Sequence, residues 1–154
     1  MRVRYKISAI ILFLAICAAV PTASYLLERY RADKATPADL YKVIHTQLNA
    51  FRADDFSLAY SQASYGMHQK FSLDAFEKMT RKDYAEFSRA QRIEFGLVQY
   101  RDRRALIEVF FIDRNDSIQP CIYNLIYEGS RWKVDGVVLL PRWPSGSHVE
   151  DLRA

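Results

Sequence analysis

The chain has 154 residues, half of them hydrophobic, and this length suits one domain with a hydrophobic core. Its formal charge is +4 at pH 7, but residues 1–36 hold six Lys or Arg and two Asp or Glu, while the rest holds sixteen of each. A folded part without net charge argues against nucleic acid as its partner, and we interpret the local basic patch of Arg101, Arg103 and Arg104 as a solvated turn.

The N-terminus is predicted to be a membrane anchor or a signal segment, over residues 1–27. Arg2, Arg4 and Lys6 precede a run of fourteen uncharged residues, and the apolar character continues to Leu27. A helix from residue 7 to residue 27 would be about 31 Å long, which matches the hydrocarbon thickness of a bilayer. The side chains expected to contact lipid include Ile7, Leu12, Leu14, Val20 and Leu27.

Two outcomes fit this segment. A retained anchor would give a single-pass protein of the cell membrane with its N-terminus inside, because basic residues stay on the inner side. Cleavage after the small residues Cys17-Ala18-Ala19 would instead give a secreted or periplasmic protein. We favour the retained anchor because the run has the full spanning length. In both cases the domain is extracytoplasmic, and the lipid bilayer is the expected partner of a retained segment.

The cysteines are two in number, Cys17 and Cys121. Because Cys17 lies within the apolar run, Cys121 has no partner in the exported domain. We therefore expect no intrachain disulfide and a buried thiol that serves packing.

Residues 28–36 are interpreted as a charged linker, residues 37–143 as the folded domain, and residues 144–154 as a loose tail. The first helix has a strong start signal, since Thr36 can cap it and Pro37 suits its first position. Its apolar residues recur at spacings of three and four and predict one buried face: Leu40, Val43, Ile44, Leu48 and Phe51. Gln47 lies inside this stripe, so its amide is expected to form a core hydrogen bond or to line a pocket.

Two further helices are expected before the sheet. Asp54-Asp55 ends the first helix and supplies capping carboxylates for a second, across residues 56–63. A third helix is predicted to start at Ser72, because Phe71 and Phe76 have the spacing of a hydrophobic staple.

After Arg92 the hydrophobic pattern changes from helical to alternating. We expect Ile93, Phe95 and Leu97 to share one face of a first strand. Three more strands are predicted, over residues 105–112, up to residue 128, and from residue 131 to about residue 140. Gly129-Ser130 predicts a tight hairpin turn between the last two.

Helices followed by hairpin-linked strands predict an α+β domain, with about three helices on a four-stranded antiparallel sheet. The inner strands carry apolar residues on both faces, since Leu106 and Phe110 oppose Ile107, Val109 and Phe111. The outer face should therefore be covered too. A homodimer through this outer sheet face is the simplest arrangement.

Residues 41–140 resemble a known family. The matching residues are Gln47-Leu48, Ala50-Phe51-Arg52-Ala53-Asp54-Asp55, Ala59, Ala63-Ser64, Phe71, Phe76, Met79, Tyr84 and Trp132-Lys133-Val134-Asp135-Gly136. They are similar to domain of unknown function 4864, which looks like a branch of the nuclear-transport-factor-2-like (cystatin-like) superfamily. The resemblance implies a cone of helices on a curved sheet around a pocket, and no established activity. The chain departs from the family pattern at two positions: Tyr65 stands where the family usually has a proline, and Val137 stands where it often has a cysteine.

Enzymes related by this fold place a histidine, aspartate or tyrosine inside the cone. The candidate catalytic residues here are His45, Asp54 and Asp55, with a structural histidine and two helix caps as the favoured interpretations. No His or Cys pair has the spacing of metal ligands, and no cofactor is expected.

The pocket-lining candidates are Gln47, Phe51, Tyr60, Tyr123, Tyr127 and Trp132. The neutral domain, the aromatic interior and the anchor favour a non-enzymatic, membrane-tethered module that binds a small apolar ligand or a protein. One alternative is a lyase or isomerase that uses His45 and an aspartate. The other is a scaffold component of an envelope or secretion assembly.

Overall fold

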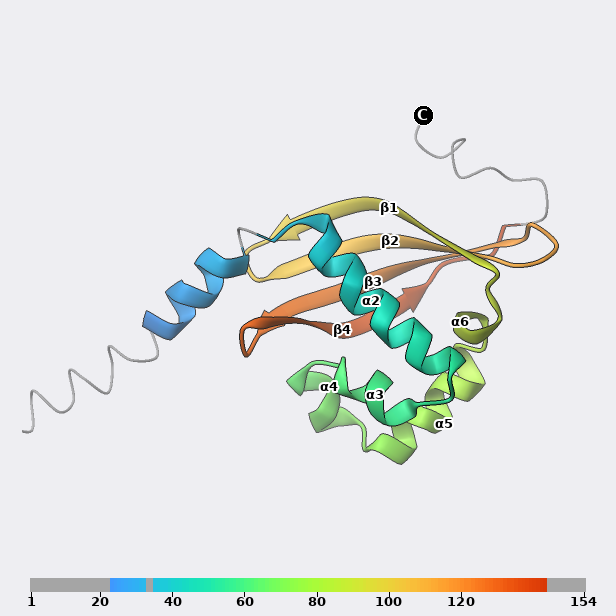
Figure 1. The fold of residues 1–154 in the computed structure, drawn as a ribbon, viewed down its shortest axis with the longest axis horizontal. Coiled ribbons are helices and arrows are strands. Elements are labelled where there is room, and N and C mark those ends of the chain that lie inside the picture. Colours follow the sequence, from blue (N-terminus) through green and yellow to red (C-terminus); the bar gives the residue numbers. More distant parts are fainter. Residues whose placement is uncertain (1–22, 33–34, 144–154) are drawn as a thin grey trace, which may run out of the picture.

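The computed structural model describes residues 23–32 and 35–143, which form a run of helices followed by a four-stranded sheet (Figure 1). The helices after the first described segment are α2 (Pro37–Arg52), α3 (Phe56–Ser61), α4 (Tyr65–Lys70), α5 (Leu73–Asp83) and α6 (Glu86–Arg89). The strands are β1 (Arg92–Arg101), β2 (Arg104–Ile112), β3 (Ile118–Glu128) and β4 (Arg131–Leu139). They pair antiparallel in the order β1-β2-β3-β4. The predicted α+β class is confirmed.

Helix α2 begins where the sequence predicts. The Asp39 carboxylate accepts hydrogen bonds from the backbone N–H and the hydroxyl of Thr36, both at 2.9 Å, and these bonds lower the pKa of Asp39. Pro37 lies in the first turn, where the backbone N–H that proline lacks would have no partner within the helix. The buried residues of the helix are Leu40, Ile44, Gln47, Leu48, Ala50 and Phe51. Four of the five predicted apolar residues and Gln47 are buried, and Val43 is partly buried against the core, so the predicted face is confirmed.

Four short helices, two more than predicted, connect α2 to the sheet. Asp55, Ser64 and Ser72 cap the first three, each accepting a hydrogen bond from a backbone N–H three positions later. The start of α5 after Ser72 was predicted. Helix α4 was not, because its six residues include Gly66 and none of them is buried, so it has no hydrophobic stripe.

Strand β1 departs from the predicted alternation. Its register with β2 shifts between Phe95 and Val98, which makes a bulge at Gly96-Leu97. Leu97 is therefore exposed, and Val98 packs against the core instead. The prediction that Leu97 shares the face of Phe95 was wrong, because one extra residue reverses the alternation. A Cβ at Gly96 would lie 2.8 Å from the Phe110 ring, so the bulge also requires glycine.

The sheet has apolar side chains on both faces, as predicted. The inner face packs under the helices, where Ile107 and Val109 are fully buried. A smaller cluster on the outer face consists of Phe110, Ile112 and Ile118, with Trp143 packed against it. Val138, paired with Ile122 of β3, is 61% exposed, so part of this outer face is uncovered. The homodimer through it stays a prediction.

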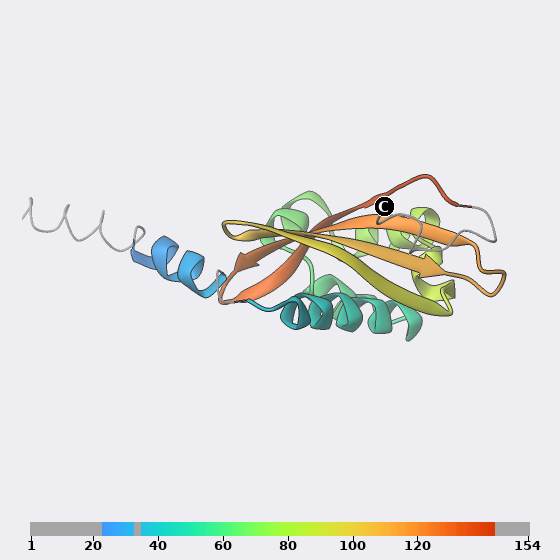
Figure 2. The ribbon, with the colours of Figure 1, turned by 90° about the horizontal axis from the view of Figure 1, so that it is seen from above.

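Residues 23–32 form a helix that docks on the two hairpin turns at one end of the sheet (Figure 2). Glu28 pairs with Arg103 of the first turn, and Arg29 pairs with Asp102 at 2.9 Å. Arg31 donates a hydrogen bond to the hydroxyl of Ser130 in the second turn. Residues 28–32 of the expected linker are thus helical and attached to the domain. In the second turn, Gly129 and Ser130 have φ of 53° and 63°, as a tight hairpin requires.

Most of the predicted anchor, residues 1–22, lies outside the described residues, as does the tail from residue 144. Within residues 23–32 and 35–143, no helix has the length and apolar character needed to cross a membrane. The anchor therefore stays a prediction.

Candidate functional site: an apolar cavity between the helices and the sheet

A cavity of about 210 Å³ lies between the helices and strand β4. Its lining residues come from α2, the α4 and α5 region, α6 and β4: Gln47, Phe51, Ala63, Met67, Phe71, Phe76, Met79, Thr80, Tyr84, Phe87, Val134, Gly136 and Val137. Most of them are aromatic or aliphatic. The wall therefore favours an apolar occupant.

The cavity has a closed side and an open side. Its floor is made by buried residues of the helices, among them Phe51, Phe76 and Phe87. Met67 and Val137, by contrast, are partly exposed and lie on α4 and β4. Access from solvent is therefore expected between α4 and β4.

The floor is a packed aromatic cluster. The Phe51 ring centroid lies 6.0 Å from that of Phe76 and 5.8 Å from that of Phe87, and Tyr60 packs against Phe76 at 5.3 Å. Such ring pairs stabilise one another beyond their burial. The cavity thus has a rigid floor, whereas the two methionines, Met67 and Met79, give its walls adaptable side chains.

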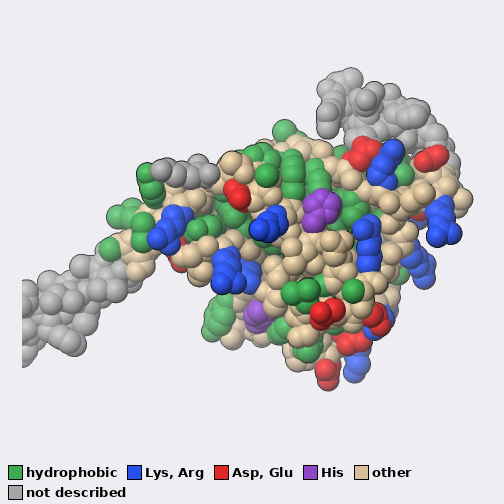
Figure 3. Space-filling view, in the orientation of Figure 1, with side chains coloured by type: hydrophobic (Ala, Val, Ile, Leu, Met, Phe, Trp, Pro, Cys, Tyr) green, Lys and Arg blue, Asp and Glu red, His purple; other side chains and the backbone are tan. Residues whose placement is uncertain are grey.

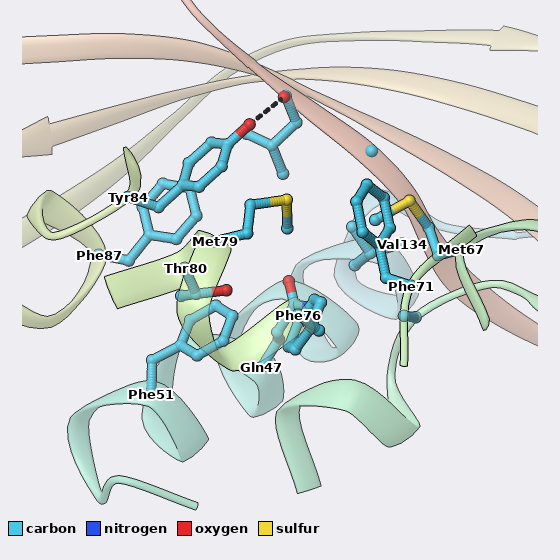
Figure 4. Close-up of a pocket in the computed structure, with 13 residues that line it drawn as sticks. Gln47, Phe51, Met67, Phe71, Phe76, Met79, Thr80, Tyr84, Phe87 and Val134 are labelled. Carbon is cyan, nitrogen blue, oxygen red and sulfur yellow. Dashed lines mark hydrogen bonds between the residues drawn. The ribbon is translucent and has the colours of Figure 1, made fainter. Parts of the chain in front are cut away.

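Two buried polar groups point into this apolar space (Figure 4). The Gln47 amide nitrogen donates a hydrogen bond to the carbonyl of Ala59 at 3.3 Å. Because that carbonyl can only accept, the Gln47 side-chain oxygen must face the other way, toward the cavity. Gln47 is 3% exposed and Thr80 is 5% exposed. Among the described residues, neither this oxygen nor the Thr80 hydroxyl has a hydrogen-bond partner.

Tyr84 closes one side of the cavity. Its hydroxyl donates a hydrogen bond to the carbonyl of Val137 at 3.2 Å and so ties the end of α5 to β4 (Figure 4). Burial raises the pKa of Tyr84 above its usual value. The phenol therefore stays neutral near pH 7, and its proton is used in holding the wall together.

The pocket-lining candidates from the sequence fall in three places. Gln47 and Phe51 line the cavity. Tyr60 packs behind its floor and donates a hydrogen bond to the Phe71 carbonyl at 2.6 Å, while Tyr123 is fully buried beside Phe87. The remaining two candidates, Tyr127 and Trp132, line a separate polar hollow at the hairpin end of the sheet.

The catalytic candidates lie elsewhere. His45 is exposed and meets the edge of the Phe95 ring, with the centroids 5.1 Å apart. Asp54 pairs with Arg81 at 2.9 Å, and Asp55 caps α3 by accepting a hydrogen bond from the Leu58 N–H. None of these three candidates is among the residues that line the cavity.

Two other kinds of reactive site are a free thiol and a metal centre. Cys121 is buried, as predicted, and burial raises the pKa of its thiol well above the usual value. Within the part of the chain that the structure describes, no cluster of three or more His, Cys, Asp or Glu side chains could hold a metal ion.

Several lining residues were not identified from the sequence, notably Met67, Thr80 and Tyr84. Thr80 follows Phe76 by one helical turn, so the spacing that marked Phe76 as buried could have found it. Met67 lies on α4, a helix that has no sequence signal beyond the capping serine Ser64. Tyr84 closes the cavity through a hydrogen bond to Val137, a residue far away in the sequence, and local sequence patterns do not reveal such contacts.

No curated protein matches the chain. A family model described as "Domain of unknown function (DUF4864)" matches residues 33–146, a range that includes every helix and strand from α2 to β4 and the whole cavity lining. The chain therefore belongs to the DUF4864 family of domains of unknown function.

Proposed function

We propose that this domain binds a small, neutral and largely apolar molecule in the cavity. The observation that carries the proposal is the pair of buried polar groups, on Gln47 and Thr80, that face an otherwise apolar space. The Gln47 oxygen and the Thr80 hydroxyl are not among the fully buried side-chain atoms that lack a partner, so both atoms keep access to the cavity space. A ligand can therefore hydrogen-bond to both groups while its apolar body fills the cavity.

The lining limits the chemistry of the ligand. The Gln47 oxygen is an acceptor and the Thr80 hydroxyl can donate or accept, so the ligand should carry a hydroxyl or an N–H group. The described lining contains no charged side chain, which disfavours an ionised ligand. A dry protein cavity of about 150 Å³ can hold benzene. The present volume, about 210 Å³, leaves room for an aromatic ring with a short polar substituent.

Binding is favoured over catalysis by the same lining. Tyr84 is the one titratable side chain among the described lining residues, and its raised pKa and its bond to Val137 make it a poor acid or base near pH 7. A lyase or isomerase needs a proton donor or acceptor within reach of its substrate. His45 and the two aspartates supply none there.

We also propose a cellular location and a superfamily for this domain. We place the domain outside the cytoplasm, tethered by residues 7–27 to the membrane. Exposed Tyr25, Leu26 and Leu27 support this, since apolar and aromatic side chains at the end of a span suit the membrane interface. Helices over one face of an antiparallel sheet, with a cavity between them, support the nuclear-transport-factor-2-like assignment.

The test compares phenol with toluene, two ligands of nearly equal size that differ in one hydroxyl. Calorimetric titration of the full chain in detergent should detect both, with phenol gaining from the polar groups. In Gln47→Met with Thr80→Val, the ratio of phenol to toluene affinity should fall about thirtyfold, the worth of two neutral hydrogen bonds of about 1 kcal/mol each. The Ala59 carbonyl keeps the hydrogen bond from the Gln62 N–H, so this double variant leaves no orphaned acceptor there.

Two further variants complete the test. Ala63→Leu places a larger side chain in the cavity and should abolish binding of both ligands. Gln99→Met with Ser57→Ala removes two exposed polar groups that are not part of the lining and should change neither affinity. Undiminished binding to the Ala63→Leu protein would contradict the proposal.

A further inference from the structure

A second hollow, of about 650 Å³, lies at the hairpin end of the sheet. It is bounded by the N-terminal helical segment, the start of α2, the end of α3 and the β3–β4 hairpin. Its charged lining residues are Arg31, Asp39, Lys42, Arg131 and Lys133, and we call this hollow the basic groove. Lys and Arg side chains gather near the base of the N-terminal segment on the face drawn in Figure 3.

The positive charge of the basic groove is poorly compensated. Four cations face one carboxylate, and that carboxylate, Asp39, already accepts two hydrogen bonds from Thr36. Burial and then repulsion by Arg131 lower the pKa of Lys133. The nearby Glu128 carboxylate raises the pKa of Lys133, but by less than burial and Arg131 lower it. The same carboxylate accepts a hydrogen bond from the Tyr65 N–H. An anion in the groove would relieve this repulsion.

The groove also holds its donors in place. The Lys133 ammonium donates to the Ser61 carbonyl at 2.6 Å, which fixes it on the wall with two N–H groups to spare. Arg31 is held on the hairpin by its bond of 2.9 Å to the Ser130 hydroxyl. Fixed donors of this kind suit a phosphate.

The groove lies beside the segment that leads from the proposed anchor. Ion pairs of Glu28 with Arg103 and of Arg29 with Asp102 hold this segment on the hairpin turns. Leu26 and Tyr30, on the same segment, are exposed. An anchored chain would therefore present both exposed apolar side chains and a basic hollow to the lipid headgroups.

We infer that the basic groove binds the phosphate group of an anionic phospholipid in the membrane that carries the anchor. This inference rests on the proposed tether and is independent of the cavity. The adjacent exposed apolar side chains favour a lipid over a free phosphate ion, because they can contact the acyl chains. Each Lys or Arg near an anionic surface contributes about 1 kcal/mol to such binding.

The experiment is native mass spectrometry of the full chain in neutral detergent, titrated with phosphatidylglycerol, phosphatidylcholine or inorganic phosphate. Arg131→Gln with Lys133→Gln should weaken phosphatidylglycerol binding about thirtyfold, the effect of two lost cationic contacts. The matched control, Lys82→Gln with Arg114→Gln, removes two exposed cations on α5 and in the β2–β3 turn and should keep the wild-type affinity.

The outcomes separate cleanly. Equal phosphatidylglycerol binding by the groove variant and the control would overturn the inference, as would equal retention of phosphatidylcholine. Inorganic phosphate that binds as tightly as the lipid would overturn the lipid assignment. Phenol binding by the groove variant serves as the fold control, and it should be unchanged because the groove and the cavity share no lining residue.

Discussion

The cavity and the basic groove are both hollows against strand β4, yet they differ in size, in polarity and in charge. The cavity is lined by apolar side chains and two polar groups, and it lies between the helices and strand β4. The groove is larger, open and cationic, and lies beside the N-terminal segment. One domain thus combines a site that selects by size and hydrogen bonding with one that selects by charge.

The difference follows from which residues each site shares with the core. Phe51, Phe76 and Phe87 belong both to the cavity floor and to the hydrophobic core, so the cavity is part of what holds the fold together. Lys42 and Arg131 are exposed, and changes there should leave the core intact. The two sites can therefore be separated by mutation.

The largest expected effect is on stability. Phe51→Ala removes a ring from the floor and should lower the free energy of unfolding by about 3–5 kcal/mol, the usual cost of such a truncation in a core. Lys133→Gln should lower it by less than about 1 kcal/mol, because this cation is partly solvated. Urea denaturation of both variants measures the contrast. Similar losses for the two variants would show that Lys133 contributes as much to the free energy of unfolding as Phe51, and would contradict this contrast.

Salt should distinguish the two sites next. Raising the ionic strength from about 0.01 M to about 0.15 M shortens the screening length from about 30 Å to about 8 Å. Phosphatidylglycerol binding should weaken about tenfold over this range, because it depends on charge. Phenol binding should stay within about twofold, because the cavity lining is uncharged. Titrations at both salt levels check this, and a salt-sensitive phenol affinity would contradict the separation.

The smallest effect concerns Asp54, which belongs to neither site. Hydrogen bonds from Arg81 lower the pKa of Asp54, so this pair stabilises the folded state above the usual carboxyl pKa of about 4. That contribution is lost as the pH falls through the lowered value. Arg81→Gln should thus reduce the urea midpoint slightly at pH 7 and no longer do so at strongly acidic pH. Its phenol affinity should equal that of the wild type.

The local parts of the fold could be predicted from the sequence. Helix α2, its buried face with Gln47, and the hairpin at Gly129-Ser130 were predicted because capping, periodicity and turn chemistry act between near neighbours. The β1 bulge was missed because it depends on a contact of Gly96 with β2.

The site was harder to predict than the fold. Gln47 was identified by its polarity within an apolar stripe. Tyr127 and Trp132 could not be assigned to the groove from alternation alone, because a strand pattern tells which face a side chain takes but not which hollow lies over that face. The cavity itself results from α4, α5 and β4 meeting in space.

The most direct measurement is methyl NMR of the full chain with ¹³C-labelled methionine, because two of the three methionines, Met67 and Met79, line the cavity. Titration with phenol should shift both of these signals with one common saturation curve. The Ala63→Leu variant should show no such shifts. If phenol moves neither signal in the wild-type chain, the cavity does not bind the class of ligand proposed for it.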